Sequence, residues 1–233
     1  MDFLFRRKPF HDQNKLRIFF SGWGMCPEGN RLESDCDLLL ISNYTDLTPL
    51  PDLSAYQEIE IIAWSLGVYH AAKLLSYSQD LPVSHSIAIN GTLEPISEQF
   101  GIPPKIFSGT LEKWNETTRF KFNRRMFSHP EHAAEFQKLP MRPVEEQKEE
   151  LAAIAARVEK QKREKNYFDT AIVGVQDRIF PAKAQQQAWE REKSVLVLLQ
   201  DFGHDFRPFY RSFEELLMDG TLPPDVCTQY HLL

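Results

Sequence analysis

Short apolar runs rich in branched side chains recur along the chain, and each is bounded by turn formers or by a helical pattern, as buried strands are. Within each run the apolar character is nearly continuous rather than alternating. That pattern is typical of parallel strands whose sheet is covered by helices on both faces. The runs predict six strands, at Leu16–Phe20, Asp37–Ile41, Ile59–Trp64, His85–Asn90, Thr170–Val175 and Ser194–Leu199.

Helical patterns fall between several of these runs. Leu66–Tyr77 follows the third run and Ala182–Lys193 follows the fifth, with Pro181 where a first helical turn tolerates proline. Strands that alternate with helices favour an α/β fold, here a mostly parallel central sheet with helices on both faces.

The middle of the chain breaks this alternation. Between Thr92 and Asn166 no run has the pattern of a buried strand, and Val144–Lys165 is rich in the good helix formers Glu, Lys, Ala and Gln. Two ordinary crossover helices with a long loop are the alternative, but the section is long for that. We therefore expect residues 92–166 to form a helical lid insertion, and residues 1–91 and 167–233 to form the core.

Composition narrows the class of protein. The chain is 42% hydrophobic and 26% charged, which allows a full core and excludes a disordered tail. No stretch reaches the ~18 apolar residues of a spanning helix, and the first cations follow the apolar residues, unlike a secretory signal. A net charge of -6 argues against nucleic-acid binding. The three scattered cysteines predict a cytoplasmic protein with reduced thiols and no disulfide framework, and a monomer is the default expectation. They are Cys26, Cys36 and Cys227.

The most informative segment runs from Glu60 to Val68, where a branched strand leads through Ala-x-Ser-x-Gly directly into a helix. A nucleophile elbow needs this context, because a sharp strand-to-helix turn exposes the serine hydroxyl at the carboxyl end of the strand. Ser65 is the candidate nucleophile, Gly67 supplies one small flanking residue, and Ala63 replaces the usual first glycine. The alternative interpretation is that Ser65 is a plain helix N-cap.

A serine hydroxyl needs a base, and the base needs a carboxylate that orients it. His204 follows the last predicted strand in a glycine-containing loop, which suits a base. Asp177 follows the fifth strand and is the candidate carboxylate, with Asp201 and Asp205 as alternatives. Asp177 is also a natural helix N-cap. The order Ser65, Asp177, His204 is that of α/β-hydrolases, and each residue follows a separate predicted strand.

Two backbone amides are candidates for stabilising the oxyanion of a tetrahedral intermediate. One is the amide of Leu66, directly after the candidate nucleophile. The other is the amide of Trp23, in a Gly-flanked turn after the first predicted strand, although a simple turn with a packed Trp23 is the alternative. His129 and His132 have a spacing compatible with a metal site, but no further ligand pattern accompanies them, so we expect neither a metal nor an organic cofactor.

Four segments together resemble one family: Ser-Gly-Trp-Gly at residues 21–24, Ala-Trp-Ser-Leu-Gly at 63–67, Gly-Val-Gln-Asp-Arg-Ile-Phe-Pro at 174–181 and Gly-His-Asp-Phe at 203–206. They are similar to those of the short branch of the pimeloyl-[acyl-carrier protein] methyl ester esterases of biotin synthesis, in the α/β-hydrolase superfamily. The likeness extends from about Lys15 to the C-terminus. Ala63 and Ser21 depart from the pattern, since many relatives carry glycine and histidine there, and Ser21 leaves the support of the oxyanion loop undefined.

The resemblance implies a serine esterase with Ser65 as nucleophile, His204 as base, Asp177 as its orienting partner, and the Trp23 and Leu66 amides as oxyanion donors. It implies cleavage of the methyl ester of pimeloyl-acyl carrier protein, with release of methanol. There are two alternatives: another serine carboxylesterase or thioesterase that acts on small acyl substrates, and a non-catalytic binding protein of the same fold.

An acidic carrier protein requires a local basic surface on a chain of net charge -6. The predicted insertion contains such a cluster, interleaved with two phenylalanines that we expect to face inward. A solvated helix face is the alternative. The candidate carrier-binding residues are Arg119, Lys121, Arg124, Arg125 and Arg142.

Overall fold

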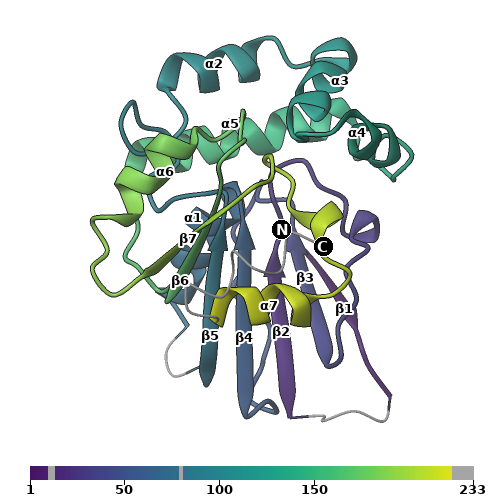
Figure 1. The fold of residues 1–233 in the computed structure, drawn as a ribbon, viewed down its shortest axis with the longest axis vertical. Helices are drawn as coiled ribbons and strands as arrows, with labels where there is room; N and C mark the ends of the chain where they lie inside the picture. Colours follow the sequence, from purple (N-terminus) through teal and green to yellow (C-terminus); the bar gives the residue numbers. More distant parts are fainter. Residues whose placement is uncertain (10–13, 79–80, 222–233) are drawn as a thin grey trace.

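The computed structural model describes residues 1–9, 14–78 and 81–221. Its centre is a seven-stranded sheet in the order β1-β3-β2-β4-β5-β6-β7 (Figure 1). β1 is antiparallel to β3, and the other neighbours are parallel. The strands are β1 (Asp2–Arg6), β2 (Lys15–Phe20), β3 (Asp37–Ser42), β4 (Glu58–Trp64), β5 (Val83–Ile89), β6 (Thr170–Gly174) and β7 (Leu196–Gln200).

The mostly parallel sheet and the six predicted strands are confirmed, with bounds that differ by one or two residues. The sequence analysis missed β1, the N-terminal edge strand. Its apolar run, Phe3–Phe5, has only three residues and is followed directly by cations, so it lacks the longer run of an inner strand. These residues are only partly buried in the structure. Cys227 lies outside the described residues.

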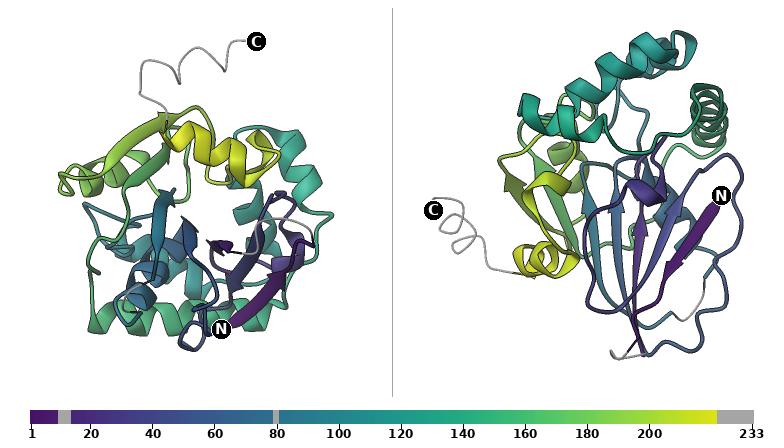
Figure 2. Two further views of the ribbon diagram at one scale, coloured as in Figure 1. Left: turned by 90° about the horizontal axis from the view of Figure 1, so that it is seen from below. Right: turned by 90° about the vertical axis from the view of Figure 1, so that its right-hand side faces the viewer.

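The core consists of two apolar layers on the two faces of the sheet. Ile18 of β2 belongs to the layer that includes α1 (Leu66–Leu75) and α6 (Ala182–Trp189). Phe19, the next residue, belongs to the opposite layer, under α7 (Phe213–Thr221). Figure 2 shows α7 and α1 on opposite sides of the sheet. Helices therefore cover both faces, as the nearly continuous apolar strands predicted.

Helices α2 (Pro104–Glu112), α3 (Glu116–Arg125), α4 (Pro130–Phe136) and α5 (Val144–Lys160) connect β5 to β6. They lie over the carboxyl edge of the parallel strands (Figure 1), and we call them the lid. The division of the chain into a core and an insertion at residues 92–166 stays a prediction. Within the described residues, no helix has the length and apolar character needed to cross a membrane.

Candidate active site

Ser65 occupies a sharp turn between β4 and α1. Its backbone has φ 59° and ψ -129°, a conformation that a residue with a side chain adopts only at an energetic cost. Its hydroxyl makes no capping hydrogen bond to α1, so the N-cap alternative does not describe how the side chain is used. A Cβ at Gly67 would lie 2.5 Å from the main-chain oxygen of Ser21, and only glycine permits this approach of helix to strand.

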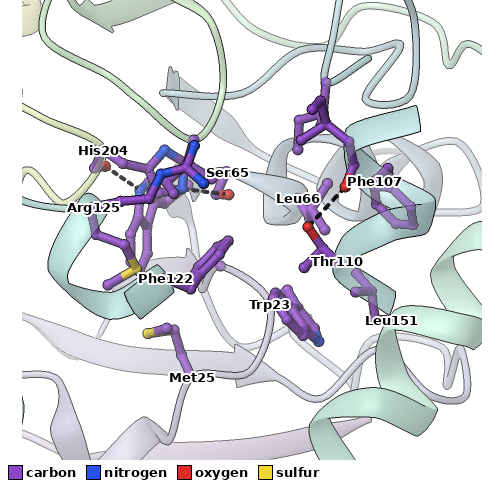
Figure 3. Close-up of a pocket in the computed structure, with 16 residues that line it drawn as sticks. Trp23, Met25, Ser65, Leu66, Phe107, Thr110, Phe122, Arg125, Leu151 and His204 are labelled. Atoms are coloured by element: carbon purple, nitrogen blue, oxygen red, sulfur yellow. Dashed lines mark hydrogen bonds between the residues drawn. The ribbon is translucent and has the colours of Figure 1, made fainter. Parts of the chain in front are cut away.

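The side chains of Ser65, His204 and Asp177 form one hydrogen-bonded chain (Figure 3 shows its Ser65–His204 part). His204 Nε2 lies 2.9 Å from Ser65 Oγ, and His204 Nδ1 lies 2.8 Å from Asp177 Oδ2. A carboxylate only accepts, so Nδ1 carries the proton and Nε2 is left to accept from the serine hydroxyl. All three residues are buried. This arrangement can activate the hydroxyl as a nucleophile.

Asp177 is held in place by three further hydrogen bonds. Its Oδ1 accepts from the backbone amides of Ile179 (2.8 Å) and Phe180 (2.9 Å), and its Oδ2 accepts from Gln185 Nε2 (3.0 Å). The first two bonds define a tight turn that leads toward α6. Asp177 therefore shapes the local turn and presents a carboxylate oxygen to His204 at the same time. Asp201 and Asp205 make no hydrogen bond to the His204 ring among the described residues.

Asn90 and Trp64, which the sequence analysis did not single out for this purpose, hold the loop that carries His204. The side-chain amide of Asn90 donates to the carbonyls of Gly203 (2.9 Å) and His204 (2.8 Å), and its oxygen accepts from the amide of Gly174 (2.7 Å). Trp64 Nε1 donates to the same His204 carbonyl at 2.8 Å. A polar residue at the end of a buried strand is the only sequence signal for Asn90.

The two candidate oxyanion donors border the same cavity as Ser65. Leu66 is the first residue of α1, where a backbone N–H has no intrahelical acceptor. Trp23 lies in the loop after β2, and its indole Nε1 donates to the main-chain carbonyl of Gln147 at 2.6 Å. Trp23 is 7% exposed and also packs against Trp114, so its side chain is a wall of the cavity.

The cavity beside Ser65 is narrow, about 50 Å³, and its walls are mostly apolar. The core side of the apolar wall consists of Trp23, Met25, Trp64, Leu66 and Ile179, and lid residues form the other side (Figure 3). Such a lining suits an aliphatic acyl chain next to a polar reaction centre. The lid residues at the cavity are Ile106, Phe107, Thr110, Phe122, Arg125 and Leu151, with Ile102 and Met126 next to the lid helices.

The five candidate carrier-binding residues do not share one outer face. Arg142 is buried and its Nη1 donates to Glu150 at 2.6 Å, which differs from the exposed cation expected from the sequence. Arg119 donates to the Arg142 carbonyl at 3.0 Å and pairs with Glu116. A charged group that is desolvated in this way needs its internal partner. We therefore withdraw Arg142 from the candidate docking surface.

The other three cations of this set are exposed, but one has a second role. Arg125 lines the cavity beside Ser65 and donates to the carbonyl of Arg178 at 2.8 Å, whereas Lys121 and Arg124 face solvent. Phe122 faces inward as expected, but Phe120 is 48% exposed. The sequence pattern therefore located the basic helix without resolving which of its residues point outward.

A groove between α2 and α3 continues the cavity toward the outside. It has a volume of about 400 Å³ and shares Ile106, Thr110, Phe122 and Arg125 with the cavity. Its lining includes four cations and no carboxylate. Lys105 and Lys113 had no recognisable pattern in the sequence, since Lys105 is in the first turn of α2 and Lys113 directly follows its last residue. The cations are Lys105, Lys113, Lys121 and Arg125.

His129 and His132 lie near each other, with ring centroids 5.4 Å apart. In the part of the chain that the structure describes, no three His, Cys, Asp or Glu side chains are grouped as metal ligands.

Comparison with known proteins identifies a family. The family model described as "Pimeloyl-ACP methyl esterase BioG" matches residues 6–214. A protein of Bacteroides fragilis named malonyl-[acyl-carrier protein] O-methyltransferase is 43% identical over 178 residues, 75% of this chain but only 36% of that relative. The chain thus spans about a third of that relative's length.

Solved structures agree with this family. The crystal structure of BioG from Haemophilus influenzae has a TM-score of 0.84 and 34% sequence identity, and the match covers 93% of this chain and 99% of that one. An esterase from Exiguobacterium antarcticum has a TM-score of 0.62 at 15% identity, with 93% of each chain covered, and shows the fold alone. The fold is therefore the α/β-hydrolase fold expected from the sequence.

Proposed function

Because the chain belongs to the pimeloyl-ACP methyl esterase BioG family, we propose that it hydrolyses the methyl ester of pimeloyl-acyl carrier protein through an acyl-enzyme on Ser65. The single observation that carries the serine mechanism is the chain of two hydrogen bonds, 2.9 and 2.8 Å, from the Ser65 hydroxyl through His204 to Asp177. The apolar cavity beside Ser65 supports an acyl substrate.

In the proposed reaction Ser65 Oγ attacks the ester carbonyl while its proton passes to His204 Nε2. Asp177 stabilises the resulting imidazolium and keeps its orientation. The tetrahedral intermediate collapses with cleavage of the carbon–methoxy bond, and His204 gives the proton to the departing methoxy oxygen, so methanol leaves. Water then attacks the acyl-enzyme with His204 as base, which releases the carboxylic acid and returns the proton to Ser65.

The charge on the carbonyl oxygen needs donors during both halves of the reaction. We assign this role to the amides of Trp23 and Leu66, because both residues line the cavity beside Ser65, one in the loop after β2 and the other at the start of α1. One such donor is worth about 10²- to 10³-fold in rate. The roles of these two amides and of Ser65, His204 and Asp177 belong to this proposal.

The cationic groove between α2 and α3 supports the carrier protein as the partner. A carrier protein is acidic and holds its acyl group on an extended arm, so the enzyme needs a basic outer surface that leads to the reaction centre. The groove starts at the cavity and is lined by Lys105, Lys113 and Lys121. This chain carries a net charge of -6, so a local basic cluster is needed to attract an acidic carrier protein and to orient it toward the cavity.

The test uses pimeloyl methyl ester attached to acyl carrier protein, with the free pimeloyl carrier and methanol as the measured products. Wild-type protein is expected to form both, and Ser65→Ala is expected to form neither while it keeps its unfolding temperature within a few degrees. A fluorophosphonate probe should label wild type but not Ser65→Ala. Turnover by Ser65→Ala at the wild-type rate would refute the nucleophile assignment.

The same assay separates the alternatives. Another serine esterase or thioesterase would cleave a small ester, or the carrier thioester, at least as well as the carrier-linked methyl ester. A binding protein of this fold would resist the fluorophosphonate and release no methanol. Restored growth without biotin, in a bacterium that lacks its own esterase for this step, supports the pathway assignment.

A further inference from the structure

Gln147 and Glu150 are two polar residues of the lid helix α5 that point into the protein. Gln147 is 4% exposed and Glu150 is fully buried. The buried face of α5 is otherwise apolar, with Leu151 and Ile154. Buried polar side chains are costly unless they are hydrogen bonded, so the partners of these two residues indicate what they do.

Gln147 contacts the loop that carries the candidate oxyanion donor. Its side-chain Nε2 donates to the carbonyl of Gly24 at 2.9 Å, and its main-chain carbonyl accepts from the indole Nε1 of Trp23 at 2.6 Å. Its Oε1 accepts from Trp114 Nε1 at 3.2 Å, at the start of the segment between α2 and α3. Gln147 therefore joins the lid to Trp23 and to the residue that follows it.

Glu150, one turn further along α5, contacts the same loop from a second point. Its Oε2 accepts from the amide of Gly24 at 3.1 Å and from Arg142 at 2.6 Å, and its Oε1 accepts from the amide of Tyr44 at 2.9 Å. Burial raises the pKa of the Glu150 carboxyl, and the Arg142 charge and the two amides act against that rise. The Tyr44 hydroxyl in turn donates to the carbonyl of Ser21 at 2.7 Å.

Gly24 is thus held by α5 at both of its backbone groups. Its φ of +72° is a conformation that glycine adopts freely, so without these bonds the segment has many alternatives. The amide of Gly24 belongs to the peptide unit that directly follows Trp23, and the Trp23 indole is bonded to the same helix. α5 therefore holds the backbone directly after Trp23 as well as the Trp23 indole. Trp23 and Leu151 of α5 both border the cavity (Figure 3).

Ser21 does not provide this support. Its hydroxyl donates to the Ile41 carbonyl at 3.0 Å, which is part of β3 and not of the loop. We propose that Gln147 and Glu150 are positioning residues, which hold the Trp23–Gly24 segment so that the Trp23 amide faces the oxyanion of the transition state. This inference rests on the proposed esterase function. The lid helix then takes part in transition-state stabilisation as well as covering the acyl chain.

The first test replaces Gln147 by Met, which has a similar length but cannot donate to the Gly24 carbonyl. We expect kcat on a small methyl ester to fall about tenfold to a hundredfold, with KM changed less than about twofold. Affinity for a trifluoromethyl ketone, whose adduct with Ser65 carries an oxyanion, should fall by the same factor as kcat. Glu149→Gln, a change at an exposed neighbour on α5, is the matched control and should leave both values unchanged.

Two further variants keep the inference falsifiable if one protein does not fold. Gln147→Glu retains an acceptor for Trp114 but loses the donor and adds a buried charge, and Glu150→Gln loses one of its two acceptor oxygens. Either variant, when folded, should show the same parallel loss of kcat and inhibitor affinity. A folded variant with wild-type kcat, or a loss confined to KM, overturns the positioning role. Absence of activity in wild type would instead reject the proposed function, so the two failures are distinguishable.

Discussion

The side-chain amide of Asn90 donates a 2.8 Å hydrogen bond to the main-chain carbonyl of His204, although 114 positions separate the two residues in the chain. Asn90 stands at the end of β5, between the strand that leads to Ser65 and the strand that leads to Asp177. It has φ 47° and is fully buried. Its side chain therefore connects the end of β5 to Gly174 at the end of β6 and to the loop that carries His204.

Removal of the Asn90 side chain should lower activity by displacing the His204 loop. We expect Asn90→Gly to reduce kcat about tenfold or more, because a shift of the imidazole weakens its bond to Ser65. Asn90→Ala should match that loss of kcat and be less stable than Asn90→Gly by roughly 1 kcal/mol, since alanine is strained at positive φ. Steady-state kinetics and urea unfolding measure the two effects. Wild-type kcat in folded Asn90→Gly would show that the loop does not depend on this residue.

The positive φ of Ser65 should make the folded protein less stable, and a glycine at this position should remove that strain. Ser65→Gly and Ser65→Ala both lack the hydroxyl and should both be inactive. Only the glycine variant relaxes the backbone, so we expect its free energy of unfolding to exceed that of Ser65→Ala by about 1 kcal/mol. Urea unfolding of both variants checks this. Equal stability of the two variants would mean that the turn carries no strain.

The buried, neutral imidazole of His70 should make the protein less stable in mild acid. Burial, followed by the nearby Arg157 charge, lowers the pKa of His70 to about 3. Arg157 can only donate, so its 2.9 Å bond requires a neutral Nε2, while Nδ1 donates to the Leu66 carbonyl at 2.7 Å. The folded-state pKa lies below the unfolded value, so the unfolded chain binds the extra proton. Stability should therefore fall as pH decreases below about 6.5, by up to about 1.4 kcal/mol per pH unit.

The measurement is the free energy of unfolding in urea between pH 7.5 and pH 5. His70→Gln should flatten this dependence, whereas His85→Gln, a change at an exposed strand residue, should leave it as in wild type. The same slope in wild type and His70→Gln would assign the acid sensitivity to other groups.

Charge reversal on α3 should separate docking from chemistry. Lys121→Glu with Arg124→Glu is expected to lower kcat/KM for the carrier-linked ester about tenfold, because two exposed favourable contacts become repulsive. Hydrolysis of a small methyl ester should not change. Arg125 is omitted because it borders the cavity. Lys193→Glu, at an exposed position just before β7, is the control. Added salt should reduce the difference in kcat/KM between wild type and the double variant on the carrier-linked ester. Equal losses of activity on the carrier-linked ester and on the small ester would reject docking at α3.

The sequence alone predicted the parts of the fold that depend on local pattern. The inner strands were recognisable because both of their faces are apolar, and the turn at Ser65 because strand, serine and glycine follow directly. β1 was missed because it becomes a strand by pairing with β3, and the residues of β1 alone do not predict that contact. The sequence also named Asp177 as the candidate partner of His204, but the choice between it and Asp201 or Asp205 depends on distant strand pairings that only the structure gives.

Polar residues inside the lid were the hardest to predict. Glu145, Glu146, Glu149 and Glu150 form one acidic stretch of α5, and nothing in their spacing marks Glu150 as the buried member. Arg142 has the same difficulty, since a cation near a basic helix resembles its exposed neighbours until Glu150 is placed beside it. Both assignments require the path of the chain across the carboxyl edge of the sheet.

The bonds from α5 to Gly24 also limit how the lid can be exchanged with that of another esterase. A chimera that replaces α2 to α4 alters the acyl pocket and the outer surface but leaves the β2 loop anchored. A chimera that also replaces α5 has to supply its own acceptor and donor for that loop. We therefore expect the outer lid helices to tolerate divergence among related proteins, and α5 to be retained together with the core.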